Sequence, residues 1–266
     1  MTATAVYDDL LAECADLDAL VSGLTPSGWA LPTPADGWTI AHQIAHLSWT
    51  DRHAALAATD PEAFTRLIAE TTDPMAMVAA GADPAAHPHG PLEPWRRSRE
   101  EVVDALRALP PGARIPWFGP PMAGPSMATA RLMETWAHGQ DVADALRTTR
   151  EPTHRLRHVA HIAVRARDYA HHVNGTPPPA IPIRVELTAP TGETWTWGPG
   201  DAPEKITGLA LDFCLLAVRR RHPDDLDLHA TGPAAAHWLT IAQAFAGPPG
   251  PGRRPGQDTA HAPSTH

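Results

Sequence analysis

Two segments of the sequence carry metal-ligand residues at the spacing of one helical turn. Residues 131–142 read Arg-Leu-Met-Glu-Thr-Trp-Ala-His-Gly-Gln-Asp-Val, which places Glu134 four residues before His138. Residues 37–47 read Gly-Trp-Thr-Ile-Ala-His-Gln-Ile-Ala-His-Leu, which places His42 four residues before His46. Residues four apart lie on one face of a helix, so Glu134 and His138 could hold one divalent ion. A histidine from the other segment would complete a three-ligand set that typically leaves one coordination position for chemistry.

A polar pair at this spacing can also be an ordinary pair on a solvated helix face, worth a few tenths of a kcal/mol. Around Glu134 and His138, however, small apolar residues alternate with acids, which is typical of a pocket wall that faces other helices. Asp141 follows His138 by three residues and could orient an imidazole from outside the ligand set. The spacing alone does not choose between His42 and His46 as the third ligand.

Composition limits the classes of function. A net charge of −9 over 266 residues argues against nucleic acid as a partner, because nucleic-acid binding requires a basic surface. No apolar run approaches the ~20 residues of a membrane span, and the N-terminus lacks the pattern of a secretory signal. Cys14 and Cys214 share no short motif. We therefore expect a cytoplasmic protein with no membrane partner, acting as a monomer or homodimer.

The first part of the chain has the apolar periodicity of helices. Loops rich in Pro and Gly separate these segments, and Asp60-Pro61 is a typical helix start. We expect helices over residues 5–22, 38–59, 61–80, 92–109, 126–147 and 153–173.

The pattern changes after Pro182. Residues 183–187 alternate between apolar and polar, and residues 194–197 follow a turn, so the two segments predict a β-hairpin. A helix over 204–221, a strand over 225–230 and a helix over 233–246 are expected next. We thus predict an α+β protein with a helical metal-binding domain at 1–175, a small α+β domain at 181–247 and, because large apolar residues are nearly absent, a disordered tail at 248–266.

The two ligand segments resemble motifs of the mycothiol-dependent maleylpyruvate isomerase family. The motifs are Gly37-Trp38-Thr39 with Ala45-His46-Leu47, and residues 134–141. The resemblance implies a DinB-like four-helix bundle in which His46, Glu134 and His138 bind a divalent metal, usually zinc, leaving His42 as a pocket residue. Four further segments, 117–122, 184–190, 211–216 and 244–250, look like an actinobacterial subgroup of uncharacterised metal-binding proteins.

The resemblance further implies that the open coordination position takes the thiol of mycothiol, which then attacks a small electrophilic substrate. Zinc and mycothiol are therefore the expected cofactors, and a metal-dependent isomerase or transferase the expected enzyme. Candidate catalytic residues are Arg131, His42 and Asp141, and candidate cofactor-binding residues are Trp117 and Arg165. From the residues alone, a metal-bound water fits equally well, and the alternative is a non-catalytic protein that binds metal and an apolar ligand.

Overall fold

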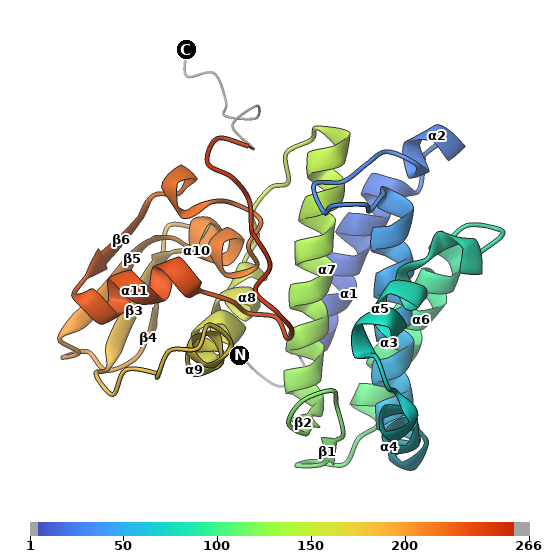
Figure 1. Cartoon of the computed structure of the whole chain (residues 1–266), viewed down its shortest axis with the longest axis horizontal. Coiled ribbons are helices and arrows are strands. Elements are labelled where there is room, and N and C mark those ends of the chain that lie inside the picture. The colour runs from blue at the N-terminus through green and yellow to red at the C-terminus, as the bar shows by residue number, and fades with distance from the viewer. Residues whose placement is uncertain (1–4, 258–266) are drawn as a thin grey trace. The chain divides into compact units, whose positions relative to one another are not determined.

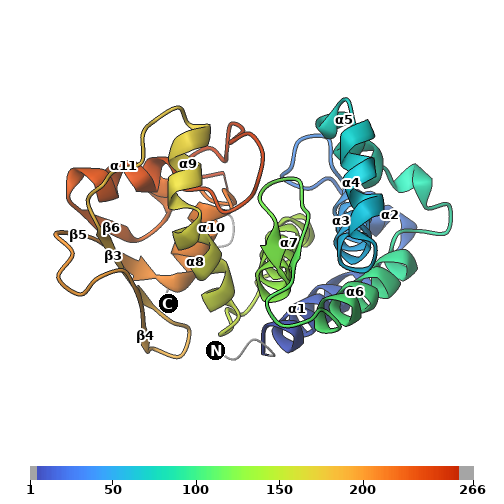
Figure 2. The ribbon, with the colours of Figure 1, turned by 90° about the horizontal axis from the view of Figure 1, so that it is seen from below.

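Four long helices pack side by side in the first of the two units into which the chain divides, residues 1–148 and residues 149–266. The computed structural model describes residues 5–257 (Figure 1). The bundle helices are α1 (Ala5–Val21), α3 (Ile40–Thr59), α6 (Leu92–Arg107) and α7 (Gly124–Leu146). Helix α3 contacts α6 and α7, and α1 contacts the same two helices, so the core lies between all four (Figure 2).

Shorter elements lie around the bundle. They are α2 (Pro26–Trp29), α4 (Pro61–Glu70), α5 (Pro74–Ala82), the 3-10 helix η1 (Pro84–Ala86) and the two-stranded antiparallel ribbon of β1 (Arg114–Ile115) and β2 (Met122–Ala123). The predicted helix at 61–80 is thus two helices. The first of them ends at Glu70. The second begins after Asp73, whose carboxylate accepts hydrogen bonds from the backbone N–H groups of Met75 and Ala76, with Pro74 at the first helical position.

Helix α7 begins at a glycine that packs closely against both neighbouring helices. A Cβ on Gly124 would lie 3.0 Å from the Tyr7 hydroxyl of α1 and 3.2 Å from the Leu106 carbonyl of α6. Close contact at this point brings α7 against both neighbours, and the buried apolar face of α7, including Leu132 and Val142, continues the packing. This packing fixes the face on which α7 carries its polar residues.

In residues 149–257, the described part of the second unit, four α-helices and one 3-10 helix accompany a four-stranded sheet. Its elements are α8 (Leu156–Arg165), α9 (Arg167–Val173), β3 (Ile183–Thr188), β4 (Thr194–Trp197), β5 (Glu204–Leu209), α10 (Ala210–Ala217), the 3-10 helix η2 (Pro223–Asp225), β6 (Leu228–Thr231) and α11 (Pro233–Ile241). The strand order is β4-β3-β5-β6; β3 and β5 are parallel, and the other neighbours are antiparallel. Helix α10 packs against β3 and β5, and α11 against β5 and β6.

Three sequence expectations need correction. Residues 204–209 form β5 rather than the start of a helix, because they pair with β3 and bury Ile206 beside Val185. The division falls after Thr148 rather than at 175, because α8 packs against α10 and α9 against α11. Residues 248–257 are not disordered, since Gly256 donates its backbone N–H to the carboxylate of Asp225.

The remainder of the predicted tail, residues 258–266, lies outside the described residues. None of the helices between residues 5 and 257 is long and apolar enough to cross a membrane. The α+β class and the helical bundle agree with the sequence prediction, and the bundle positions the residues considered next.

Candidate metal centre

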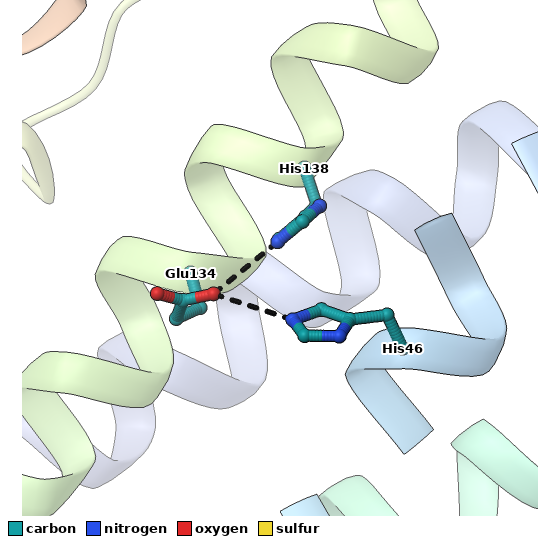
Figure 3. A group of neighbouring side chains, drawn as sticks. All are labelled: His46, Glu134 and His138. Carbon is teal, nitrogen blue, oxygen red and sulfur yellow. Dashed lines mark hydrogen bonds and ion pairs between the residues drawn. The ribbon is translucent and has the colours of Figure 1, made fainter. Parts of the chain in front are cut away.

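Helices α3 and α7 bring three of the predicted residues to one point. His46 lies on α3, and Glu134 and His138 lie one turn apart on α7 (Figure 3). The Nε2 atom of His138 is 3.2 Å from Oε2 of Glu134, and the Nε2 atom of His46 is 3.7 Å from the same oxygen. The ligand atoms of all three residues lie within 4.8 Å of one another.

This arrangement fits a divalent ion. Two donors that each lie about 2.0–2.2 Å from a tetrahedral zinc ion are roughly 3.4 Å apart, close to both observed distances to Oε2 of Glu134. The two histidine side chains are 11 % exposed and that of Glu134 is 22 % exposed. An ion held by these atoms would therefore be reachable by a small molecule without being freely solvated.

The surroundings of Glu134 favour the ionised form of its carboxyl group. Burial by itself raises its pKa, but the contacts with the imidazoles of His138 and His46 and the charge of Arg131 outweigh burial. The pKa of Glu134 therefore lies well below its usual value. Glu134 is consequently a carboxylate over the whole physiological pH range, as metal binding requires.

Aromatic side chains surround the two imidazoles. The Trp38 ring stacks on His138, with the ring centroids 6.0 Å apart, and lies 5.3 Å from His46. Trp49 stacks on His46 with the ring centroids 6.3 Å apart, and Phe118 stacks on Trp49 at 6.1 Å. Phe118 is 39 % exposed. Apolar rings thus flank the ligand atoms, which lowers the local polarity and favours interactions between charges there.

A protein-family model covers the part of the chain that holds the three ligand candidates. The family model described as mycothiol maleylpyruvate isomerase N-terminal domain matches residues 10–143, which is half of the chain and includes all three ligand candidates. The chain belongs to the mycothiol-dependent maleylpyruvate isomerase family. A second model, described as wyosine base formation, matches residues 179–231 in the second unit.

Relatives with similar sequences carry no assigned activity. Uncharacterized proteins from two strains of Mycobacterium tuberculosis are 56 % identical to this member of the family over 248 residues, covering 92 % of this chain and 96 % of theirs. The crystal structure of the mycothiol-dependent maleylpyruvate isomerase matches with a TM-score of 0.58 and 14 % identity, covering 88 % of this chain and 96 % of that one. The TM-score shows a shared fold, and at 14 % identity the match shows the fold alone.

Two candidate catalytic residues take part in local structure. Arg131 is buried, donates from Nε to Asp51 at 2.8 Å and contacts the Thr50 hydroxyl at 2.5 Å. The Nδ1 atom of His42 accepts a hydrogen bond from the backbone N–H of Thr39, which caps the start of α3. A catalytic role for Arg131 or His42 stays a prediction.

The other candidates lie in different places. Asp141 is buried on α7, one turn after His138. Trp117 stacks on Phe64 of α4, with centroids 5.5 Å apart. Arg165 belongs to the second unit, where it lines a surface cavity of about 430 Å³ together with Ile181, Trp238 and eight other residues. Binding of a cofactor by Trp117 or Arg165 also stays a prediction.

The sequence did not predict the contact between Gln43 and His138. The Nδ1 atom of His138 makes a short hydrogen bond to Oε1 of Gln43, a fully buried residue of α3. Gln43 precedes His46 by three residues, so the two lie on neighbouring positions of one helix face. The spacing places Gln43 near His46, as it places Asp141 near His138, but no local pattern shows that Gln43 contacts His138 on α7.

Proposed function

We propose that this chain is a divalent-metal-dependent enzyme in which His46, Glu134 and His138 hold the ion. The proposal rests on one observation: the ligand atoms of these three residues converge at a partly exposed point between α3 and α7. A bound divalent ion would lower the pKa of a thiol or water and polarise a carbonyl. Zinc is the ion that two imidazoles and one carboxylate suit well.

The protein's own cysteines do not supply the thiol. Cys14 and Cys214 are both fully buried, and burial raises the pKa of each thiol far above its usual value. A buried neutral thiol is a poor nucleophile, because the thiolate is the reactive form. An external thiol fits this chain, and mycothiol is our proposed co-substrate, given the name of the matching family model.

The reaction class we propose is isomerisation or S-transfer on a small electrophilic substrate, carried out in the cytoplasm. The residues of the chain would act mainly by positioning. Glu134 supplies a fixed negative charge, and Trp38 and Trp49 cover the imidazoles and limit the access of water. An ion held in this way would act in a site of low polarity, where charge interactions are stronger than in water.

Metal content and thiol dependence test the proposal. Wild-type protein should bind one zinc ion in equilibrium dialysis, and His138→Ala and Glu134→Gln should lose it. His89→Ala is the matched control, because His89 is an exposed histidine of the same unit outside the cluster. Zinc-loaded wild type should then convert a small electrophile, from a panel that includes maleylpyruvate, only when mycothiol is added.

Two results would count against this function. Wild-type protein that binds no divalent ion would remove the metal site altogether. Protein that binds zinc in the predicted way but neither binds mycothiol nor turns over any electrophile would favour the alternative, a non-catalytic protein that binds metal and an apolar ligand.

A further inference from the structure

A chain of hydrogen bonds runs from His138 to the loop that carries Trp38. The Oε1 atom of Gln43 contacts Nδ1 of His138, and the Nε2 atom of Gln43 donates to the Thr33 hydroxyl at 2.9 Å. That hydroxyl donates in turn to the carbonyl of Trp38 at 3.0 Å. Gln43 has no exposed surface, so both ends of its amide depend on these partners.

The donor and acceptor groups allow only one direction for this series of hydrogen bonds. A carbonyl oxygen only accepts hydrogen bonds, so the proton of the Thr33 hydroxyl points to Trp38 and its oxygen accepts from Gln43. The NH₂ group of Gln43 therefore faces Thr33, and its oxygen faces His138. Because this oxygen can only accept, Nδ1 of His138 must carry the proton. In the neutral imidazole that metal binding requires, the Nε2 atom, which faces Glu134, then keeps its lone pair.

His46 offers a contrast within the same site. Its Nδ1 atom is buried and has no hydrogen-bond partner among residues 5–257. The tautomer of His46 is therefore not set by a neighbour, whereas that of His138 is. A ligand histidine whose second nitrogen is held by an acceptor is fixed in both tautomer and ring orientation.

We infer that Gln43 is a positioning residue that holds His138 in the tautomer able to bind metal and ties the metal site to the Trp38 loop. This inference rests on the proposed metal site. The loop is itself closed by two backbone bonds, from Thr33 N–H to Trp38 at 2.8 Å and from Trp38 N–H to Ala35 at 2.9 Å. Since Trp38 also stacks on His138, the loop contacts this imidazole directly through the Trp38 ring and indirectly through the hydrogen bonds of Gln43.

The first test measures zinc affinity of the full chain by competition with a chelator. Gln43→Leu should bind zinc about 10–100-fold more weakly than wild type, the usual effect of losing a hydrogen-bond partner behind a metal ligand. Gln43→Glu should restore most of the affinity, because a carboxylate also accepts from Nδ1. Equal affinity of Gln43→Leu and wild type would overturn the inference but leave the proposed function intact.

The second test uses Thr33, which touches no metal ligand. Thr33→Val removes the group that holds the amide of Gln43 in one orientation, so it should weaken zinc binding, whereas Thr33→Ser keeps the hydroxyl and should not. This pair also decides the matter if Gln43→Leu does not fold. Identical zinc affinities of Thr33→Val and Thr33→Ser would overturn the inference that the Thr33 hydroxyl orients Gln43 toward His138.

A third readout follows the loop rather than the ion. Zinc should slow hydrogen exchange of the peptide 31–39 in wild type and Thr33→Ser, and much less in Thr33→Val and Gln43→Leu. Zinc binding that leaves this peptide unchanged in wild type would overturn the coupling to the loop. Wild type that binds no zinc would overturn both the inference and the proposed function.

Discussion

The buried ion pair between Asp51 and Arg131 should make the folded first unit less stable than an apolar pair of similar volume would. The Nε atom of Arg131 is 2.8 Å from the carboxylate of Asp51, and the two side chains are 3 % and 2 % exposed. Burial raises the pKa of Asp51 despite the charge and hydrogen bond of Arg131. Its second oxygen, Oδ2, has no hydrogen-bond partner among the described residues. The attraction within the pair therefore does not offset the loss of water around the carboxylate.

The sign of the pKa shift decides the expected pH dependence. A carboxyl whose pKa is higher in the folded state than in the unfolded state makes folding less favourable as pH rises between those two values. At neutral pH the pair is thus a net cost relative to an apolar pair of similar volume. Replacing both residues, as Asp51→Leu with Arg131→Met, should leave the first unit as stable as wild type or about 1–4 kcal/mol more stable.

The single replacements should behave differently from each other. Asp51→Leu leaves a guanidinium buried without its partner and should lose about 3–5 kcal/mol. The stability of this variant gains no pH dependence from the remaining arginine, which stays charged. Because wild type becomes less stable as pH rises through the range in which Asp51 titrates, the loss relative to wild type should shrink with rising pH. Arg131→Met leaves a carboxyl that can take up a proton, so its loss should shrink as pH is lowered.

Hydrogen exchange of peptides from α3 and α7, recorded as urea is raised in the presence of a chelator, measures opening of the first unit separately from the second. The chelator keeps metal binding out of the comparison. If the double variant loses as much stability as Asp51→Leu, the pair is a net stabilising interaction and the reasoning from burial is wrong. A loss in Arg131→Met that does not change with pH would refute the assignment of the raised pKa to Asp51.

Three further outcomes are expected. Arg96 donates to Asp18 from Nε at 2.8 Å and holds the pKa of Asp18 below its usual value, so the pair stabilises the fold above the unfolded pKa of ~3.9 and less as pH falls below it. Asp18→Asn should lose about 1 kcal/mol at pH 7, reduced by solvent screening, and urea titrations should show this loss shrinking as pH falls below ~3.9. A Cβ on Gly81 would lie 2.4 Å from the Trp49 ring, so Gly81→Ala should lower the free energy of unfolding by about 1–3 kcal/mol and lower the Tm with it. Gly23→Ala is the control, because nothing lies within 4 Å of that Cβ, and its Tm should not change. Free zinc at 100 times its Kd should raise the free energy of unfolding by about 2.7 kcal/mol, and a chelator should remove that gain; unchanged unfolding with zinc would mean that the folded state does not bind it.

The sequence by itself predicted the parts of this protein that depend on local periodicity. The one-turn spacing of Glu134 and His138 put both side chains on one face of α7, because a helix repeats every 3.6 residues. Alternation over residues 183–187 and 194–197 likewise predicted β3 and β4, since successive side chains of a strand face opposite ways. The motif around His46 added the family and hence the bundle.

Only the tertiary structure decided what depends on residues far apart in the chain. Residues 204–209 are a strand because β3 offers a partner for their backbone, which no local pattern records. The division after Thr148 follows from the packing of α8 and α9 on later helices. Gln43 contacts His138 across 95 positions, and Arg131 pairs with Asp51 across 80. Spacing along one helix shows which side chains share a face, but only the packing of two helices shows what each face meets.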